Sequence, residues 1–490
     1  MGTALVVLHI DGLGADSLEE ALRAGLTPFI QHLIDAEGYE IHRYRCGLPS
    51  TTPFVQAGIL YGDNTNIPSF RWWDRERQLM VRFGAGSTFK KVADKYFHDC
   101  HPFARHGACI AACYPAGAAE DFGISYRERT YSEDENSRSA SRIVLAYLAN
   151  PIHLADWLWY AVVSIWRTST EYVAARMSGR RPSPEYVLTD AAEEIFVHHL
   201  TRYAVEKAMY EGYSPIYAGF YAFDETGHAF GPDHRHTQSI LKHVDHTIRK
   251  VAEARRDRYE LVVLSDHGQI ETVPFYAQDG VRLGELVAGS MPGFRVEEMK
   301  GKTFGPDAEH AKGRIRLTYT GGLAHMYVGN GKRRLTFEDV VASHPELVHN
   351  LLRQDRIALM MARGRRDDIF IAGGVKYRGA GVKEVLAGFE EPDIVYEQLT
   401  RLNSFEQAGD LILFGVFRGG KQINFEPQLG GHGAFGGEQG HPFVLAKREW
   451  MIDTSHVHGA HQVHPILSDL RDRLKKEEGP VVKPALRSGG

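Results

Sequence analysis

The fold-deciding stretch of this chain is Leu261-Val-Val-Leu-Ser-Asp266-His267-Gly268. It is a continuously apolar, β-branched run that ends in two side chains able to bind metal, and such a run is typical of a strand buried on both faces of a parallel sheet. Ala4–Ile10 (ALVVLHI) and Ile216–Phe223 (IYAGFYAF) have the same character, and the next residues are Asp11 and Asp224. The sequence therefore predicts three buried strands, each followed by an aspartate.

Helical patterns between these runs indicate an α/β fold. Asp245–Arg255 (DHTIRKVAEAR) has the pattern of a helix and precedes the third strand, as a crossover between parallel strands requires. We predict a central, mostly parallel sheet flanked by helices. In such sheets ligands bind beyond the carboxyl ends of the strands, so the three aspartates are expected to share one site.

Two segments interrupt this alternation of strands and helices. Residues 115–200 have mainly helical periodicity, and residues 335–405 mix short strands with a helix. The predicted organisation is a catalytic core formed by residues 1–114, 201–334 and 406–465, a helical insertion at 115–200, a small α+β cap at 335–405 and a flexible tail at 466–490.

The most apolar run of the chain is Trp157–Trp166 (WLWYAVVSIW), which is much shorter than the ~20 residues that span a bilayer. We expect it to be a buried helix face, with a membrane-surface or dimer contact as the alternative. The N-terminus lacks the basic region and cleavage site of a signal peptide. These features predict a cytoplasmic protein without a transmembrane segment.

The composition is that of a soluble globular protein, with 490 residues, 43% hydrophobic and 24% charged. The formal net charge of −5 gives no global basic field, so specific nucleic-acid binding is not expected. The four cysteines do not have the spacing of a zinc ribbon and are interpreted as reduced structural thiols; they are Cys46, Cys100, Cys109 and Cys113.

The clearest chemical signal is the pair of motifs Asp224-Glu-Thr-Gly-His228 and Asp266-His267-Gly268. Carboxylate and imidazole ligands are typical of catalytic Zn²⁺ sites, and Mn²⁺ accepts a similar set. Adding Asp11 and His432 gives three Asp and three His, enough for two divalent ions, with Zn²⁺ favoured. Two such ions stabilise the attacking and leaving oxygens of an in-line displacement at phosphorus, which indicates phosphoryl transfer.

A nucleophile for this reaction is expected at a helix N-terminus, where backbone N–H groups and the helix dipole favour negative charge. Pro49-Ser-Thr-Thr-Pro53 has this character, with Pro53 suited to the first helical position and Thr52 to the N-cap. Ser50 and Thr51 are chemically similar alternatives. Metal coordination would lower the pKa of such a hydroxyl and make it nucleophilic.

The order of these motifs resembles the alkaline phosphatase superfamily, particularly its type I phosphodiesterase / nucleotide pyrophosphatase branch. The resemblance covers about residues 1–75, 215–275 and 405–445, and includes the Pro-Ser-x-Thr motif followed ten residues later by Gly62. It implies Thr52 as the nucleophile. It also implies one metal on Asp224, His228 and His432, and a second on Asp11, Asp266, His267 and the Thr52 oxygen.

The chain departs from this branch after the nucleophile helix, where an Asn that helps to hold the phosphoryl group is usual. The aligned stretch here is Ile67-Pro-Ser-Phe-Arg71-Trp-Trp-Asp74. Asn64, Asn66 and Arg71 are the candidate substitutes for substrate binding. Arg71 would grip phosphoryl oxygens bidentately, which favours a doubly charged monoester.

The sequence thus predicts a metal-dependent hydrolase of small-molecule phosphodiesters or pyrophosphates that acts through a phosphothreonine. The first alternative is a phosphomonoesterase or phosphonate-ester hydrolase with the same site. The second is a non-catalytic, metal-stabilised binding protein. His325 is interpreted as a core histidine, and the oligomeric state stays open.

Overall fold

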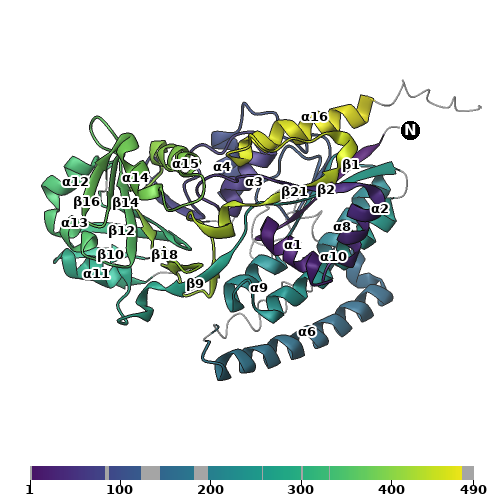
Figure 1. Cartoon of the computed structure of the whole chain (residues 1–490), viewed down its shortest axis with the longest axis horizontal. Coiled ribbons are helices and arrows are strands. Elements are labelled where there is room, and N and C mark those ends of the chain that lie inside the picture. The colour runs from purple at the N-terminus through teal and green to yellow at the C-terminus, as the bar shows by residue number, and fades with distance from the viewer. Residues whose placement is uncertain are drawn as a thin grey trace, which may run out of the picture.

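Two large sheets lie at opposite ends of the molecule along its long axis (Figure 1). A computed structural model of the chain describes residues 3–82, 88–122, 144–180, 182, 197–255, 258–298, 302–329 and 331–476. The seven-stranded sheet contains the predicted strands and has the order β2-β21-β8-β1-β7-β5-β6. Its bounds are β1 Ala4–Ile10, β2 Tyr39–Arg43, β5 Ala108–Ile110, β6 Glu120–Phe122, β7 Ile216–Phe220, β8 Tyr259–Ser265 and β21 Phe443–Lys447.

The pairing of this sheet is mostly parallel, as predicted. Strands β8, β1, β7, β5 and β6 all pair in parallel, and β21 alone runs antiparallel to its neighbours β8 and β2. The parallel trio β8-β1-β7 lies in the middle of the sheet, so its three carboxyl ends meet at one edge. This edge is where the predicted site must lie.

Both faces of the sheet are buried, which explains the continuously apolar strands. Alternate residues of β1 point to opposite sides: Leu5 and Val7 join one core cluster, while Val6 and Leu8 join the other. The first cluster includes helices α3 (Thr52–Tyr61), α4 (Thr88–Tyr96), α15 (Pro392–Ser404) and α16 (Val463–Lys476). The second includes α1 (Ala15–Arg23), α2 (Pro28–Glu37), α8 (His198–Glu211) and α10 (Arg235–Arg255).

The second sheet has eight strands in the order β11-β10-β12-β13-β17-β14-β15-β16, and packs on α11 (Leu283–Ser290), α12 (Phe337–Ser343) and α13 (Pro345–Leu352). Its bounds are β10 Phe294–Glu297, β11 Thr303–Phe304, β12 Gly313–Thr320, β13 Leu323–Tyr327, β14 Ile357–Ala362, β15 Ile369–Ala372, β16 Val375–Arg378 and β17 Leu411–Gly415. These strands come from both sides of the predicted boundaries at 334/335 and 405/406. The division into core and cap therefore stays a prediction, and the sheet itself spans a wider range than residues 335–405.

A small four-stranded sheet lies between the two ends of the molecule and joins segments that are distant in sequence. It contains β9 (Ile270–Pro274), β18 (Phe417–Arg418), β19 (Lys421–Asn424) and β20 (Gly430–Gly431). The remaining described elements include the hairpin β3 (Arg71–Asp74) and β4 (Leu79–Arg82), and the helices α9 (Ala222–Phe230) and α14 (Lys383–Leu386). Because β20 pairs with β9, the chain just before residue 432 lies beside the chain just after residue 268.

Two local predictions were wrong. The tail predicted from residue 466 is helical up to Lys476, because Val463, Leu467, Leu470 and Leu474 form one apolar face that packs into the core. The predicted strand Ile216–Phe223 ends at Phe220, and helix α9 begins at Ala222. A short apolar run cannot by itself separate a strand end from a buried first helical turn.

Among the described residues of the insertion at 115–200, the long helix α6 (Pro151–Met177) runs along the lower edge of the molecule in Figure 1. The expectation of a buried tryptophan face is wrong for two of its three tryptophans, since Trp159 and Trp166 are 67% and 69% exposed. Parts of the predicted insertion, residues 123–143, 181 and 183–196, lie outside the described residues. In the described part of the chain, no helix combines the length and apolar character that a membrane span requires.

Candidate metal centre and nucleophile

The three predicted aspartates meet at the carboxyl edge of the central strands. Asp11 directly follows β1, and Asp266 directly follows the adjacent β8. Asp224 lies in the first turn of α9, which begins two residues after β7, the other neighbour of β1. Two glycines permit this crowding: a Cβ on Gly12, which has a φ of +73°, would lie 2.5 Å from Asp224 Oδ1, and one on Gly430 would lie 2.3 Å from the Gly227 carbonyl oxygen of α9.

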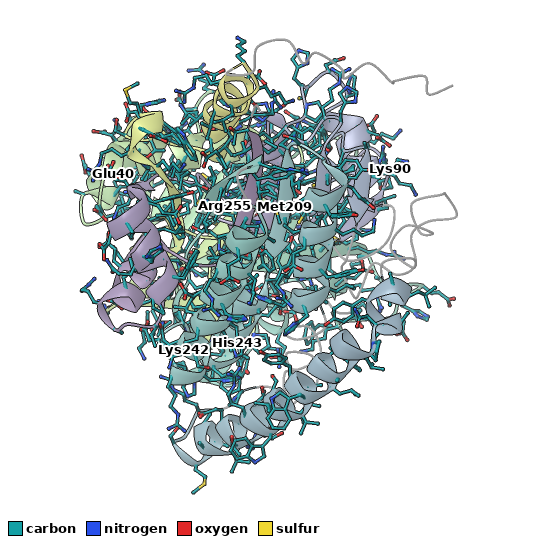
Figure 2. The ribbon with its side chains drawn as sticks, turned by 90° about the vertical axis from the view of Figure 1, so that its right-hand side faces the viewer. Glu40, Lys90, Met209, Lys242, His243 and Arg255 are labelled. Atoms are coloured by element: carbon teal, nitrogen blue, oxygen red, sulfur yellow. The ribbon has the colours of Figure 1, made fainter. Side chains whose placement is uncertain are left out.

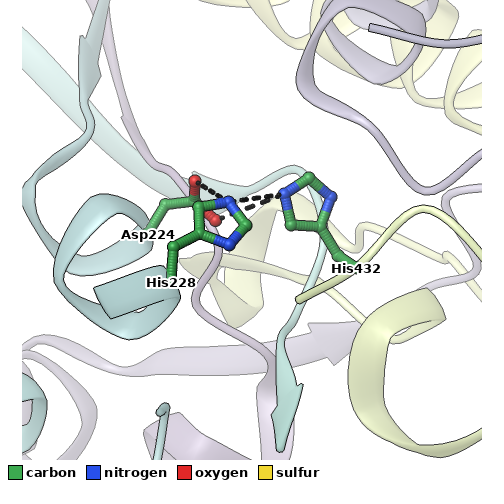
Figure 3. A group of neighbouring side chains, drawn as sticks. All are labelled: Asp224, His228 and His432. Carbon is green, nitrogen blue, oxygen red and sulfur yellow. Dashed lines mark hydrogen bonds and ion pairs between the residues drawn. The ribbon is translucent and has the colours of Figure 1, made fainter. Parts of the chain in front are cut away.

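The first group of candidate metal ligands is Asp224, His228 and His432, hereafter the outer group (Figure 3). Asp224 and His228 are four residues apart on α9 and therefore face the same side, with Oδ2 and Nε2 3.1 Å apart. His432 follows β20, and its Nε2 lies 3.2 Å from His228 Nε2 and 3.6 Å from Asp224 Oδ1. The pairing of β20 with β9 explains why His432 lies near Asp224 and His228 although it is distant in sequence.

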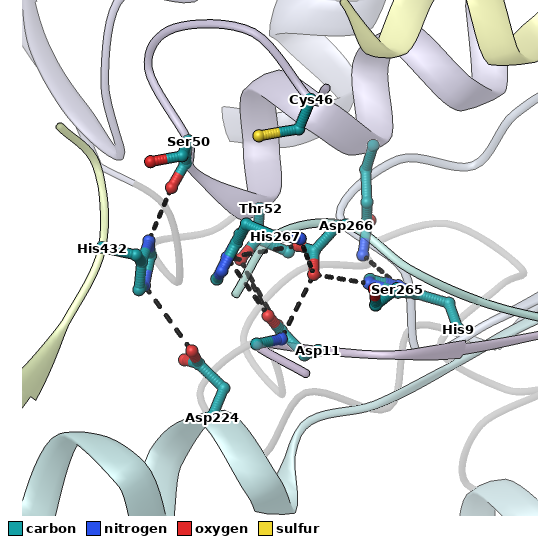
Figure 4. A network of polar contacts seen from close by, with 12 residues as sticks. His9, Asp11, Cys46, Ser50, Thr52, Asp224, Ser265, Asp266, His267 and His432 are labelled. Atoms are coloured by element: carbon teal, nitrogen blue, oxygen red, sulfur yellow. Dashed lines mark hydrogen bonds and ion pairs between the residues drawn. The ribbon is translucent and has the colours of Figure 1, made fainter. Parts of the chain in front are cut away.

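The second set of candidate ligands, hereafter the inner group, is Asp11, Asp266 and His267, as the family resemblance implies (Figure 4). By geometry these residues belong to two overlapping clusters, one of His9, Asp11 and Asp266 and one of Asp11, Asp224 and His267. His267 Nε2 lies 3.4 Å from Asp11 Oδ1 and 3.3 Å from Asp266 Oδ2. Asp266 Oδ1 accepts hydrogen bonds from the backbone N–H of Gly12 at 3.2 Å and of His267 at 2.9 Å. The two groups adjoin, because the His267 and His432 rings stack with centroids 3.8 Å apart.

All three histidines present the same nitrogen to the centre. Each Nδ1 atom lies near a backbone carbonyl oxygen. His228 Nδ1 is 3.0 Å from that of Gly430, His267 Nδ1 is 3.1 Å from that of Gly268, and His432 Nδ1 is 2.7 Å from that of Ser50. An Nδ1–H that donates to a carbonyl leaves the lone pair on Nε2, which is the arrangement that orients metal-ligating histidines. The tautomer follows here from the surrounding acceptors.

The electrostatics of the cluster call for added positive charge. Three carboxylates are buried together, and no lysine or arginine contacts them among the described residues. Burial, followed by the charges of Asp266 and Asp224, raises the pKa of Asp11 well above its usual range. The His228 and His432 Nε2 atoms face each other at 3.2 Å, so a proton or a metal cation is needed between them. This donor set fits divalent metal ions.

Thr52 is the predicted hydroxyl that the structure brings to these ligands. Its Oγ1 lies 3.2 Å from His267 Nε2 and 3.3 Å from Asp11 Oδ2. Helix α3 begins at Thr52 with Thr51 at the N-cap, so the predicted helix start was one residue late. Of the two alternatives, Ser50 uses its hydroxyl to bond the Ala434 carbonyl and the Gly433 N–H, and no described contact joins Thr51 to the ligands.

The predicted substrate-binding residues are placed differently from one another. Asn64 and Asn66 follow the C-terminal end of α3, ~15 Å along the helix from Thr52. Asn64 accepts a hydrogen bond from Arg401 at 2.7 Å, and Asn66 accepts one from the Glu406 N–H at 2.9 Å. Both asparagines thus have structural partners at the wrong end of the helix, and the expectation that they hold substrate is not supported.

Arg71 is nearer to the centre. It forms an ion pair of 3.8 Å with Glu426, whose other oxygen accepts a hydrogen bond from Gly321 N–H at 3.2 Å. Gly321 in turn packs against the backbone of His432, since a Cβ there would lie 1.8 Å from the His432 carbonyl oxygen. Arg71 therefore lies near the loop that carries His432 and stays a candidate for substrate binding.

One residue near the ligands escaped the sequence reasoning. His9 is fully buried, and its Nε2 lies 3.1 Å from Asp266 Oδ1. Its Nδ1 lies 3.1 Å from Nε2 of Gln56, on the same helix as Thr52. The signal was present, because odd-numbered residues of β1 share a face, so His9 and Asp11 must both point toward α3.

His325 is the core histidine that was predicted. Its Nε2 bonds the Pro68 carbonyl oxygen, and its Nδ1 accepts a hydrogen bond from the Gly409 N–H.

The sequence pattern of the family described as Type I phosphodiesterase / nucleotide pyrophosphatase matches residues 5–365, which include Thr52 and every predicted ligand except His432. No curated protein matches the chain.

Solved structures of this fold cover nearly the whole chain. Phosphonoacetate hydrolase from Sinorhizobium meliloti 1021, in complex with phosphonoformate, aligns with a TM-score of 0.51 and 15% identity over 96% of both chains. Human ectonucleotide pyrophosphatase / phosphodiesterase 5 aligns with a TM-score of 0.51 and 12% identity over 96% of this chain and 95% of that one. With an α/β core of the alkaline phosphatase type, the chain belongs to the type I phosphodiesterase / nucleotide pyrophosphatase family and is a phosphoric ester hydrolase.

Proposed function

We propose that this enzyme hydrolyses phosphodiester or pyrophosphate bonds of small molecules through a phosphothreonine intermediate on Thr52, with two divalent metal ions, Zn²⁺ being favoured. The observation that carries the proposal is the position of Thr52 Oγ1. It lies within 3.4 Å of both Asp11 oxygens and of His267 Nε2, at the N-terminus of α3.

The ligand groups support two metal positions. The outer group would hold one ion and the inner group, with the Thr52 oxygen, the other. Metal bound there supplies the positive charge that favours the alkoxide of Thr52, the leaving oxygen and a nucleophilic water near neutral pH. Mn²⁺ is the alternative metal, because carboxylate and imidazole ligands suit it as well.

The chain's own residues would carry out the following steps. Thr52 Oγ attacks phosphorus and forms the new P–O bond as the leaving oxygen departs with its bonding electrons. The N-terminus of α3 directs its N–H groups and its dipole at the phosphoryl oxygens, apart from Pro53, which has no N–H. Water then attacks the same phosphorus, which breaks the P–O bond to Thr52 and restores its hydroxyl.

A phosphomonoesterase reaction is the competing proposal for the same residues. Arg71 was expected to favour a doubly charged monoester, but the ion pair with Glu426 already offsets its charge. Diester hydrolysis is therefore favoured. The ratio of activity on bis-(p-nitrophenyl) phosphate to that on p-nitrophenyl phosphate measures the preference directly.

The test of the proposal is Thr52→Ala in the full-length, metal-loaded enzyme. We expect turnover of bis-(p-nitrophenyl) phosphate to fall by about 10⁴-fold or more, because the nucleophile is lost. Metal content, measured by elemental analysis, should stay close to that of the wild type.

Thr52→Ser is the matched control, since it retains a hydroxyl and should keep measurable activity. Mass spectrometry of acid-quenched wild type during turnover should find one added phosphoryl group on the peptide that contains Thr52. A Thr52→Ala variant that keeps a tenth of the wild-type rate would overturn the assignment of the nucleophile.

A further inference from the structure

Helix α6 carries a long apolar stripe on its outer side. Its members recur every three or four residues from Leu158 to Trp166 and again from Val173 to Met177, the spacing of a single helix face, with Ser169 and Thr170 between the two parts. The exposed apolar side chains are Leu158, Trp159, Val162, Val163, Ile165, Trp166, Val173 and Met177. Trp159 and Trp166 are about two thirds exposed, and Met177 is 84% exposed. From Leu158 to Met177 the stripe is ~28 Å long.

The opposite side of α6 faces the protein, and it mixes polar side chains with apolar ones such as Trp157 and Ala175. Arg167 lies 3.1 Å from His243 of α10, and the buried Thr168 lies 3.4 Å from His236 of the same helix. Glu171 accepts a hydrogen bond from Arg235 at 2.8 Å. A surface helix normally turns its more apolar side inward, whereas α6 leaves most of its large apolar side chains exposed. The stripe is thus not used for the chain's own core.

Cationic side chains lie close to the stripe. Arg176 is exposed on the last turn of α6, and Lys242 is exposed on α10 beside His243, which contacts α6. Figure 2 shows Lys242 and His243 next to α6, which crosses the lower part of the view, and the contact of Arg167 with His243 confirms that the two helices are neighbours. The acidic Glu171 is already paired with Arg235. The surroundings of the stripe therefore favour an anionic partner.

A phospholipid surface has the chemistry that matches this helix. Tryptophan has an apolar ring system and a polar N–H, and it prefers the boundary between lipid tails and headgroups. A helix with a one-sided apolar stripe lies in that boundary, and neighbouring cations add attraction to anionic lipids. We propose that α6 docks the enzyme on anionic phospholipid membranes, with Trp159 and Trp166 inserted among the headgroups.

The contacts of α6 with the catalytic core show why docking would hold the whole enzyme. Tyr172 and Ala175 pack against Ala229 and Phe230 of α9, the helix that carries Asp224 and His228. Arg180 donates a hydrogen bond to the Phe230 carbonyl oxygen at 2.6 Å. Docking through α6 would thus fix the metal-ligand helix relative to the membrane. This proposal is independent of which phosphate ester the enzyme cleaves.

Co-sedimentation of the full-length enzyme with vesicles tests the proposal. We expect binding to vesicles of phosphatidylcholine and phosphatidylglycerol in equal amounts, weaker binding to phosphatidylcholine alone, and a loss of binding as salt is raised. The double variant Trp159→Ser/Trp166→Ser should bind the mixed vesicles more than about tenfold less tightly, because it removes the two largest apolar side chains of the stripe. Tyr210→Ser is the matched control, since Tyr210 is 89% exposed on α8 and should not affect binding.

A second pair of substitutions tests the same surface without touching its tryptophans. Arg176→Glu/Lys242→Glu should weaken binding to the mixed vesicles several-fold and leave binding to phosphatidylcholine unchanged. All variants should hydrolyse bis-(p-nitrophenyl) phosphate at the wild-type rate without vesicles, which shows that they are folded. The proposal would be overturned if the wild-type enzyme bound neither kind of vesicle. A second outcome would also overturn it: sedimentation velocity finds a wild-type dimer and a monomeric tryptophan variant, and neither protein binds vesicles. The stripe would then be covered by a second copy of the chain.

Discussion

The inner and outer ligand groups have similar side chains but are built differently. The inner group lies at the ends of adjacent parallel strands, and its side chains are at most 3% exposed. Backbone N–H groups of Gly12 and His267 fix the Asp266 carboxylate. The outer group combines a helix with a distant loop, and its side chains are 5–11% exposed. One group is thus fixed by the sheet, and the other by tertiary contacts.

This difference has consequences for how each group should respond to change. Preorganised ligands bind metal without losing conformational freedom, whereas a ligand on a loop must first be held in place. The inner group also lies against Thr52, so its charge would act directly on the proposed nucleophile. The inner group should therefore be the more sensitive of the two to loss of a carboxylate, and the outer group the more sensitive to loss of supporting contacts.

The largest expected effect comes from removing one carboxylate charge from each group. Asp266→Asn should lower kcat on bis-(p-nitrophenyl) phosphate by more than about 100-fold, because it removes the charge of a proposed metal ligand close to the proposed nucleophile. Loss of a residue that only orients a ligand costs less, about 10–100-fold. Asp224→Asn should cost less, since the outer group is farther from Thr52. Elemental analysis should find that each variant loses part of its metal. If Asp266→Asn and Asp224→Asn lowered kcat equally, the inner group would not be the more sensitive of the two to loss of a carboxylate.

Removal of metal should show the same asymmetry in the wild type. Because the outer group is more exposed and rests on a loop, we expect a chelator to remove metal from it first. A titration with a chelator should then show two phases in metal content, with the first phase abolished by His432→Ala. A single phase in the wild type would mean that the two groups act as one site.

His9 offers a way to sharpen the comparison from the side of the inner group. Its Nε2 faces Asp266, and its Nδ1 faces Gln56, four residues after Thr52 on α3. His9→Leu should weaken metal binding by about 10–100-fold, the usual cost of losing a partner that orients a ligand. Competition with a chromophoric chelator measures this affinity without relying on turnover.

His9→Gln is the matched variant, because its amide can still donate a hydrogen bond to Asp266. We expect His9→Gln to recover a large part of the metal affinity that His9→Leu loses. If His9 only filled the core, His9→Leu would keep the higher metal affinity of the two variants. Equal affinities for both variants would show that His9 does not position the ligand.

The contrast between the groups also explains what the sequence could predict. The inner group follows from local pattern alone, since Asp11 and Asp266 directly follow buried apolar strands that are neighbours in the sheet. For Asp224 the ligand was predicted, but its place on a helix was not, because Ile216–Phe223 is apolar throughout. The partner that holds His432, the Ser50 carbonyl, lies 382 residues away, and no local pattern encodes such a contact.

The same limit applies to the segments around the site. Asn64 and Asn66 were placed near the substrate by distance along the chain, but α3 carries them to its far end. The apolar run of α6 predicted a buried face, because periodicity reports that a helix has an apolar side and not which way that side turns. Tertiary contacts show the direction, both the polar ones to His236 and His243 and the apolar ones to Ala229 and Phe230.

The smallest expected effect comes from the contacts that support the outer group. Ser50 accepts a hydrogen bond from Gly433 N–H at 2.8 Å and donates one to the Ala434 carbonyl oxygen at 3.0 Å, which pins the loop after His432. Ser50→Ala removes both bonds and keeps the backbone carbonyl that orients His432. Each net hydrogen bond contributes about 1 kcal/mol, so loss of the two bonds should lower affinity at the outer group by about 30-fold at most, with the inner group unchanged.

Ser50→Thr is the matched control, since it keeps the hydroxyl at this buried position. The measurement is the first phase of the chelator titration, which reports on the outer group alone. A shift of the second phase instead would mean that the nucleophile loop supports the inner group. Because Ser50 lies two residues before Thr52, such a shift would show that the two groups are coupled through the start of α3, and the comparison between them would have to be made on the pair as a whole.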